Sequence, residues 1–395
     1  MRIYKSERRF YVPARGLATA LSLLFAFFYS KELGVLNRSY VAVIMTLSVL
    51  IIILITSGTT LTLRNLPMAE KTSENLSSFF SLIELMSVIG LVLFCFFLFI
   101  FSIFRNALPH PFIIASIIYF ISSLVHLVSM EILIAFDRFK RAGKYEIFTI
   151  FLQLFFYFVG KYTTEFSIAN RLFLSLSASY LIIAILCYID LRPHFVKIIG
   201  FHDPRLFLRQ TRGNHSIGTV LGMVDRFDRL IIVWFLPVIL LGKYTIMSSF
   251  ISFFRFIPDA MSKILVSSKS EAWRAYLKKP ALLFIALASL VAVMILTSQL
   301  LINHLLGPEW LLPWGVSFMF ALQELARGAF QLSGNYRVSV GSSSQAHKAA
   351  LILLFTATPL SIVLSRWQGL IGVPLGFFIT YAGLLLYMKS EAKHE

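Results

Sequence analysis

The chain has 395 residues, of which 58% are hydrophobic and only 14% are charged. A soluble globular domain carries roughly 25% charged residues, so this composition excludes a soluble protein and indicates an integral membrane protein. The formal net charge is +17, but the basic residues lie in short segments between apolar stretches. That distribution indicates membrane topology and argues against nucleic-acid binding.

Apolar stretches long enough to cross a bilayer, roughly 17–25 residues each, recur along the chain. They are continuous and do not alternate, so we predict helical spans and not barrel strands. The first apolar stretch follows a basic start and resembles a secretory signal. It lacks a small-x-small cleavage site and is followed directly by another span, so we expect it to be retained. The predicted spans are 14–31, 39–62, 78–104, 111–136, 146–165, 169–190, 213–236, 243–265, 281–305, 311–335, 346–365 and 368–388.

Lysine and arginine concentrate in alternate loops. They are frequent at the N-terminus, in the segments 137–145, 191–212 and 263–280, and in the C-terminal tail, and they are sparse in the opposite loops. Since cytoplasmic loops carry the excess of positive charge, both termini are predicted in the cytoplasm. An even number of spans agrees with this orientation.

The longest segment between spans, 191–212, mixes bulky apolar and basic residues and predicts helices on the inner leaflet surface. It divides the chain into an N-terminal lobe, 1–190, and a C-terminal lobe, 213–395, of six spans each. Leu-Gly at 33–34 opens the second span and Leu-Gly at 241–242 opens the eighth. Both lobes begin in the cytoplasm, so the repeat is parallel, a plan that is frequent in secondary transporters.

Several predicted spans carry polar stripes. In lipid, such stripes should face a bundle interior or an aqueous cavity. Side chains three or four residues apart share a helix face. On the seventh span the stripe passes through Thr211, His215, Gly218, Gly222, Asp225 and Arg229, with Arg226 and Asp228 beside it. The eighth, tenth and first spans add Tyr244, Ser248, Ser252, Arg255 and Asp259; Ser317, Glu324, Arg327 and Gln331; and Arg15, Thr19 and Ser22. We therefore predict an aqueous cavity between the two lobes.

The intramembrane charges have two interpretations. Asp225–Arg229 at i,i+4 and Glu324–Arg327 at i,i+3 are spaced for intrahelical ion pairs that ease insertion. The same groups are also placed to meet a ligand in the cavity. Arg255 has only Asp259 as a local partner, which favours contact with an anionic ligand. Arg15 either lines the cavity or reaches the interface along its apolar stem.

Catalytic signatures are missing from the sequence. It lacks the nucleotide-binding GxxxxGK[ST] pattern and any metal-ligand spacing of His, Asp or Glu, so neither a metal nor a cofactor is predicted. Cys95 and Cys187 both lie in apolar stretches and do not indicate a disulfide framework. The predicted external loops are short, which argues against a glycosyltransferase or polymerase. We predict a transporter and not an enzyme.

Three stretches, 32–65, 217–265 and "LLGPEWLLPW" at 305–314, resemble the polysaccharide-exporter branch of the MOP flippase superfamily, the Wzx-type flippases of O-antigen or capsule repeat units. The resemblance implies an all-α membrane protein with about twelve helices in two six-helix lobes around a central cavity. It also implies alternating-access translocation of an undecaprenyl-diphosphate-linked oligosaccharide across the bacterial inner membrane, driven by an ion gradient. The implied partners are this lipid-linked substrate, membrane lipids, H⁺ or Na⁺, and polysaccharide polymerase or chain-length proteins.

Carried onto this sequence, the resemblance assigns roles to charged residues. The hypothesis places the anionic head group of the substrate at Arg15, Arg226, Arg229, Arg255 and Arg327. It assigns ion coupling to Asp225, Asp228 or Glu324. Two rival functions stay open: a MATE-like multidrug or organic-cation antiporter of the same superfamily, and a membrane-embedded polysaccharide polymerase. Flipping of a peptidoglycan precursor is a third alternative.

Overall fold

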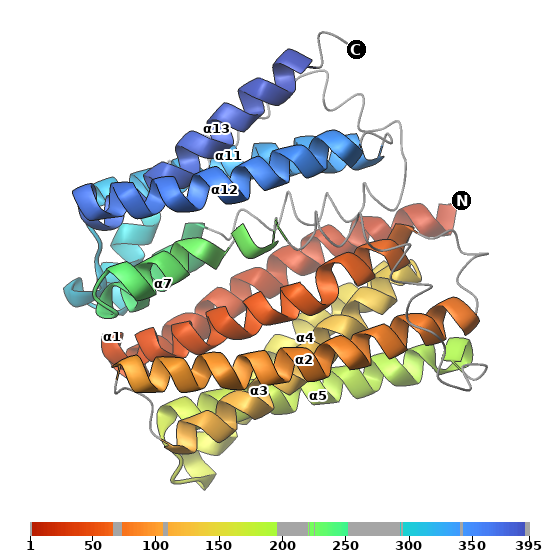
Figure 1. The fold of residues 1–395 in the computed structure, drawn as a ribbon. Helices are drawn as coiled ribbons and strands as arrows, with labels where there is room; N and C mark the ends of the chain where they lie inside the picture. Colours follow the sequence, from red (N-terminus) through yellow and green to blue (C-terminus); the bar gives the residue numbers. More distant parts are fainter. Residues whose placement is uncertain are drawn as a thin grey trace. The chain divides into compact units, whose positions relative to one another are not determined.

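A computed structural model describes residues 2–65, 73–105, 110–195, 220, 222–224, 226–251, 293, 295–339 and 343–391. Over these ranges the chain consists of long helices joined by short turns, without a strand (Figure 1). The prediction of an all-helical protein is therefore confirmed.

The N-terminal half contains five long helices. They are α1 (Arg2–Asn65), α2 (Ser73–Arg105), α3 (His110–Ala135), α4 (Phe139–Thr163) and α5 (Ile168–Phe195). Helix α1 contains the first two predicted spans, and the path of its backbone is broken between them at Gly34, where φ is 71° and ψ is 167°. Only glycine adopts this combination routinely, so the residue fixes where the first span ends.

The C-terminal half begins with helical residues 226–235 and α7 (Ile239–Ile251), and continues with helical residues 295–305. A short 3₁₀ turn, η3 (Pro308–Trp310), precedes α11 (Trp314–Ser339). The last elements are α12 (Ser343–Gln368), the 3₁₀ turn η4 (Gly369–Ile371) and α13 (Gly372–Glu391). A second positive φ, 110° at Gly307, marks the turn before η3.

Six helical regions within the described ranges are long and apolar enough to cross a membrane. Two of them, Phe10–Thr56 and Lys348–Tyr387, each contain two predicted spans, so the six regions correspond to eight predictions. The other four predicted spans overlap residues 226–235, α7, residues 295–305 and α11.

Two predicted loop boundaries are wrong. The basic segment 137–145 is mostly the first two turns of α4, because α3 ends at Ala135 and α4 already begins at Phe139. Asp137, with φ of 57°, makes the turn between them. At the other boundary, α5 runs on to Phe195, past the predicted end of its span. The remainder of the predicted surface helices, 196–212, lies outside the described residues.

The chain forms two compact units. Unit 1 comprises Met1–Phe25 and Ile44–Met223, and unit 2 comprises Ala26–Val43 and Val224–Glu395. The part of α1 around Gly34 thus belongs to unit 2, although its flanks belong to unit 1. The lobe boundaries predicted at 190 and 213 stay a prediction about the chain's organisation.

Aromatic contacts organise the core of unit 1. Helix α3 packs along α5 for much of its length, and Tyr119 of α3 meets Phe173 of α5 with ring centroids 5.1 Å apart. Phe94 of α2 stacks on Phe120 of α3 at 4.6 Å. Helix α2 touches α3 over a much shorter stretch, and many of its side chains from Glu84 onward are exposed.

In unit 2, α7 lies directly against the segment that follows Gly34. The backbone N–H of Gly242 donates to Ser39 Oγ at 3.0 Å. A Cβ at Gly242 would lie only 2.5 Å from the carbonyl oxygen of Val35. The rings of Phe27 and Phe250 meet nearby at 4.8 Å. Glycine at 242 therefore permits a backbone approach that any side chain would block.

Candidate functional site

Tyr244 is the centre of a buried polar cluster in unit 2. Its side chain is only 1% exposed, and its hydroxyl donates to Asp228 Oδ2 at 2.9 Å. The edge of its ring meets Phe320 of α11, with centroids 5.1 Å apart. Tyr244 thus connects three elements, namely residues 226–235, α7 and α11. We call Asp228, Arg229, Tyr244 and Ser248 the Tyr244 cluster.

Asp228 and Arg229 are neighbours in sequence, and both reach α7. Asp228 is 5% exposed, and its Oδ1 accepts the backbone N–H of Arg229 at 2.7 Å. Arg229 Nη2 donates to Ser248 Oγ at 3.3 Å. Tyr244 and Ser248 lie one turn apart on the same face of α7, so adjacent residues of one helix engage successive turns of another.

Helix α11 contributes a buried ion pair. Arg327 Nη1 donates to Glu324 Oε1 at 3.1 Å, and the two side chains are 5% and 4% exposed. The Glu324 carboxylate also lies close enough to Tyr244 to interact with it electrostatically. Two carboxylates therefore act on the Tyr244 hydroxyl, one through a hydrogen bond and one through its field.

The chemistry of these groups suits small charged species. Carboxylate and hydroxyl oxygens are acceptors for a proton and ligands for hard cations. Guanidinium groups recognise carboxylates and phosphates through forked hydrogen bonds. Because the cluster is largely withdrawn from solvent, a change of charge in it has a large energetic effect.

The structure brings together some of the predicted site residues. Asp228 and Arg229 lie in the Tyr244 cluster, Arg226 is half-buried on the same helix, and the predicted Glu324–Arg327 ion pair is confirmed. Asp225 and Arg255 lie outside the described residues. The predicted Asp225–Arg229 ion pair therefore stays a prediction. The roles assigned to these residues stay predictions.

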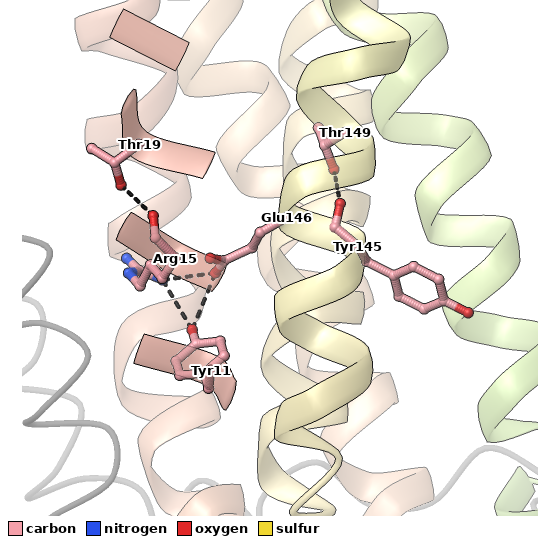
Figure 2. A network of polar contacts seen from close by, with 6 residues as sticks. All are labelled: Tyr11, Arg15, Thr19, Tyr145, Glu146 and Thr149. Carbon is pink, nitrogen blue, oxygen red and sulfur yellow. Dashed lines mark hydrogen bonds and ion pairs between the residues drawn. The ribbon is translucent and has the colours of Figure 1, made fainter. Parts of the chain in front are cut away.

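Arg15 belongs to a second polar network, in unit 1 (Figure 2). Its Nη1 donates to Glu146 Oε1 of α4 at 2.8 Å and to the Tyr11 hydroxyl at 3.0 Å. Tyr11 in turn donates to Glu146 at 3.1 Å. Tyr145, the preceding residue on α4, points away from this network in Figure 2 and donates to Asp190 of α5 at 2.7 Å. Successive residues of α4 thus bond to α1 and α5.

Two of these partners were not identified from sequence. Glu146 is 131 residues from Arg15, and helical spacing does not reveal contacts between separate helices. Tyr244 does lie on the polar stripe of the eighth span, but nothing local indicated that its hydroxyl meets Asp228. One sequence feature could have indicated such contacts. A carboxylate within a span that has no basic or donor residue at i±3 or i±4 needs a hydrogen-bond donor from another helix.

No protein-family model matches the sequence, and no curated protein matches it significantly. Among solved structures, an outward-facing multidrug resistance MATE transporter of the MOP superfamily aligns with a TM-score of 0.70 and 11% identity, covering 99% of this chain and 96% of that one. The chain has the MATE fold. An inward-facing multidrug resistance MATE transporter aligns with a TM-score of 0.65 and 13% identity, covering 98% of this chain and 95% of that one.

The Vibrio cholerae MATE transporter VcmN in its bent form gives the same result, with a TM-score of 0.62, 13% identity and coverage of 99% and 98%. This likeness confirms the predicted class, an all-helical, multi-pass membrane fold. Identities this low establish fold alone. They do not distinguish the polysaccharide-exporter branch from the others.

Proposed function

We propose that this MATE-fold protein is a transporter that flips an undecaprenyl-diphosphate-linked oligosaccharide across the bacterial inner membrane by alternating access, with both termini in the cytoplasm. The choice of an anionic, lipid-linked substrate is supported by the environment of Arg229. Its Nε is buried and makes no hydrogen bond within the part of the chain that the structure describes. A buried guanidinium N–H without an acceptor is costly unless a ligand supplies one.

A diphosphate supplies such acceptors. Its oxygens match the planar donor fork of arginine. In this proposal Arg229 holds the diphosphate, together with Arg226 and Arg255 on the flanking stretches. Arg327 acts at one remove, because its guanidinium is already paired with Glu324. Arg15 is likewise paired with Glu146, so of the five arginines assigned to the head group it contributes least in this proposal.

Ion coupling is assigned to the carboxylates of the same region. Asp228 bonds to Tyr244 and Glu324 interacts with it electrostatically. A cation gained or lost at Asp228 therefore alters the bond between residues 226–235 and α7, and one at Glu324 alters the charge beside it. Either H⁺ or Na⁺ suits these oxygen ligands. Such coupling gives the transporter a way to convert an ion gradient into a change of helix packing.

The test uses the purified protein in vesicles that contain a fluorescent undecaprenyl-diphosphate oligosaccharide. Flipping exposes the label to a membrane-impermeant quencher. We expect Arg229→Gln to lower the flipping rate at least tenfold, Arg229→Lys to retain part of it, and Lys243→Gln on α7, the matched control, to leave it unchanged. A wild-type rate no faster than that of empty vesicles would reject the assignment.

A multidrug antiporter is the second candidate, and one observation favours it. Two of the solved structures that resemble this chain are of multidrug resistance transporters. The same vesicles loaded with ethidium decide between the two functions. Gradient-driven ethidium transport without movement of the lipid-linked oligosaccharide would establish the antiporter.

A further inference from the structure

A cavity of about 800 Å³ lies in unit 1. One wall is α2, and the facing walls belong to α3 and the end of α5. It is mostly apolar, but α2 contributes a polar stripe along it, formed by Ser77, Ser81, Glu84 and Ser87. Helices α2 and α3 make few contacts with each other, which leaves room for a cavity between them. We call it the α2 groove.

The groove opens toward the surroundings of the protein. Val88 of α2, Ile121 and Val125 of α3 and Tyr188 of α5 line the groove and are exposed, as is Glu84. The mouth of the groove therefore lies on a largely apolar surface. At the far end along α3 it is bounded by Phe120, which stacks on Phe94. In a membrane-spanning protein an exposed apolar mouth faces lipid, so the occupant enters from the bilayer.

Sequence fixes the depth of the groove in the membrane. Residues 85–104 form an uncharged stretch of twenty residues between Glu84 and Arg105. At about 1.5 Å per residue this stretch is about 30 Å long, the thickness of the hydrocarbon core. Glu84 therefore lies at the boundary of the core. Ser77 and Ser81 lie at head-group level, and Val88 and Leu91 lie at acyl-chain level.

Glu84 is exposed at the mouth of the groove and is placed to take a cationic partner. Its carboxylate makes no ion pair or hydrogen bond with any described residue, and it is the one charged side chain that lines the groove. A carboxylate at the edge of the hydrocarbon core is costly unless it is paired. The order along the groove is thus hydroxyls and a negative charge at head-group level, followed by an apolar channel. That order complements an amphiphile with a positive head and an apolar tail.

We propose that the α2 groove binds a phospholipid with an ammonium head group, of the ethanolamine type, from the leaflet on the cytoplasmic side of the predicted topology. Its ammonium group pairs with Glu84, and an acyl chain lies between α2 and α3 along the apolar part of the groove. A lipid fits better than a compact organic cation, because the groove extends from head-group level well into the acyl region. This site goes beyond the proposed function, and its binding is measured without transport.

The experiment uses the full-length protein, delipidated in detergent and titrated with dioleoyl-phosphatidylethanolamine or dioleoyl-phosphatidylglycerol. Native mass spectrometry counts the bound lipid. We expect wild type to prefer the ethanolamine lipid by about tenfold, because a charge-assisted hydrogen bond to Glu84 is available only to that head group. Glu84→Gln should abolish the preference. Glu165→Gln, the same change in an exposed loop of unit 1, should not.

A second variant tests the tail. Val125→Trp fills the mouth without changing charge and should weaken binding of both lipids. Equal binding of the two lipids by wild type, or an undiminished preference in Glu84→Gln, would overturn the proposal. So would saturation by tetraphenylphosphonium without any ethanolamine-lipid adduct, which would identify the occupant as a small cation. All three variants are first checked for a monodisperse elution profile.

Discussion

The unit 1 network and the Tyr244 cluster each combine a tyrosine, an arginine and a carboxylate, but they differ in burial. In unit 1, Tyr11, Arg15 and Glu146 bond to one another, and the side chains of the ion pair are 23% and 18% exposed. In unit 2, Asp228 and Tyr244 are buried beside Arg229, and the neighbouring Glu324–Arg327 pair is nearly inaccessible. Similar polar groups therefore contribute different free energies in the two units, because their burial differs.

This difference separates a structural tie from a candidate for function. A partly hydrated ion pair contributes little to stability, typically about 0–1 kcal/mol, because water and salt screen it. A buried pair gains little over an apolar replacement, yet losing one partner is severe. Burying the charges of the Tyr244 cluster and of the Glu324–Arg327 pair costs folding free energy, which makes them candidates for a functional role. The unit 1 network, in contrast, links α1 to α4. Four predictions test this contrast.

The largest effect is expected at the buried ion pair. Glu324→Met leaves the Arg327 guanidinium buried without its carboxylate and should destabilise the protein by about 3–5 kcal/mol. The double variant Glu324→Met/Arg327→Met should recover most of the loss, because neither charge then remains. Thermal unfolding in detergent measures both. Equal or additive losses in the double variant would contradict the prediction.

Next comes the charge of Asp228. Asp228→Asn keeps an oxygen that accepts the Tyr244 hydrogen bond but removes the negative charge. We expect it to lower gradient-driven transport by roughly two orders of magnitude. It should also lower stability by about 1–3 kcal/mol, because the new amide NH2 faces the backbone N–H of Arg229, which Asp228 Oδ1 now accepts. Transport is measured in vesicles with and without an imposed H⁺ or Na⁺ gradient. A variant that still responds fully to the gradient would exclude Asp228 from ion coupling.

A smaller effect is expected from the tyrosine itself. Tyr244→Phe retains the ring contact with Phe320 and removes the donor to Asp228, which should cost about 1–3 kcal/mol. Tyr11→Phe is the matched change in unit 1 and should cost less, because Glu146 keeps its bond to Arg15. The comparison is made by unfolding both variants side by side. Equal losses would show that burial does not distinguish the networks.

The smallest effect is expected at Arg15 and Glu146. Glu146→Gln should cost less than about 1 kcal/mol, and the coupling energy in a double-mutant cycle with Arg15→Gln should shrink as salt is added. A loss comparable with that of Glu324→Met would mean that this pair, too, is effectively buried in the membrane.

Sequence was sufficient for the class of fold and insufficient for the partners. Apolar length predicted the spans, because a bilayer demands about twenty apolar residues regardless of neighbours. The i,i+3 spacing predicted Glu324–Arg327 because both residues share one helix. It failed for Glu146 and for the Asp228–Tyr244 bond, since contacts between helices depend on how each helix is rotated and placed. The start of α4 was missed for a related reason: Lys140, Arg141 and Lys144 looked like a loop, but charged residues readily occupy a helix end that extends beyond the lipid.

Gly34 and Gly242 have an implication for the ancestry of the two halves. An alignment of the halves pairs these glycines, and their identity invites an inference of gene duplication. Gly34 is required because its backbone has a positive φ, although there is free space around it. Gly242 is required because a Cβ there would collide with the carbonyl oxygen of Val35. Each position would select glycine independently. The shared Leu-Gly is therefore no evidence of common descent, and the case for an internal duplication rests on the other positions of the halves.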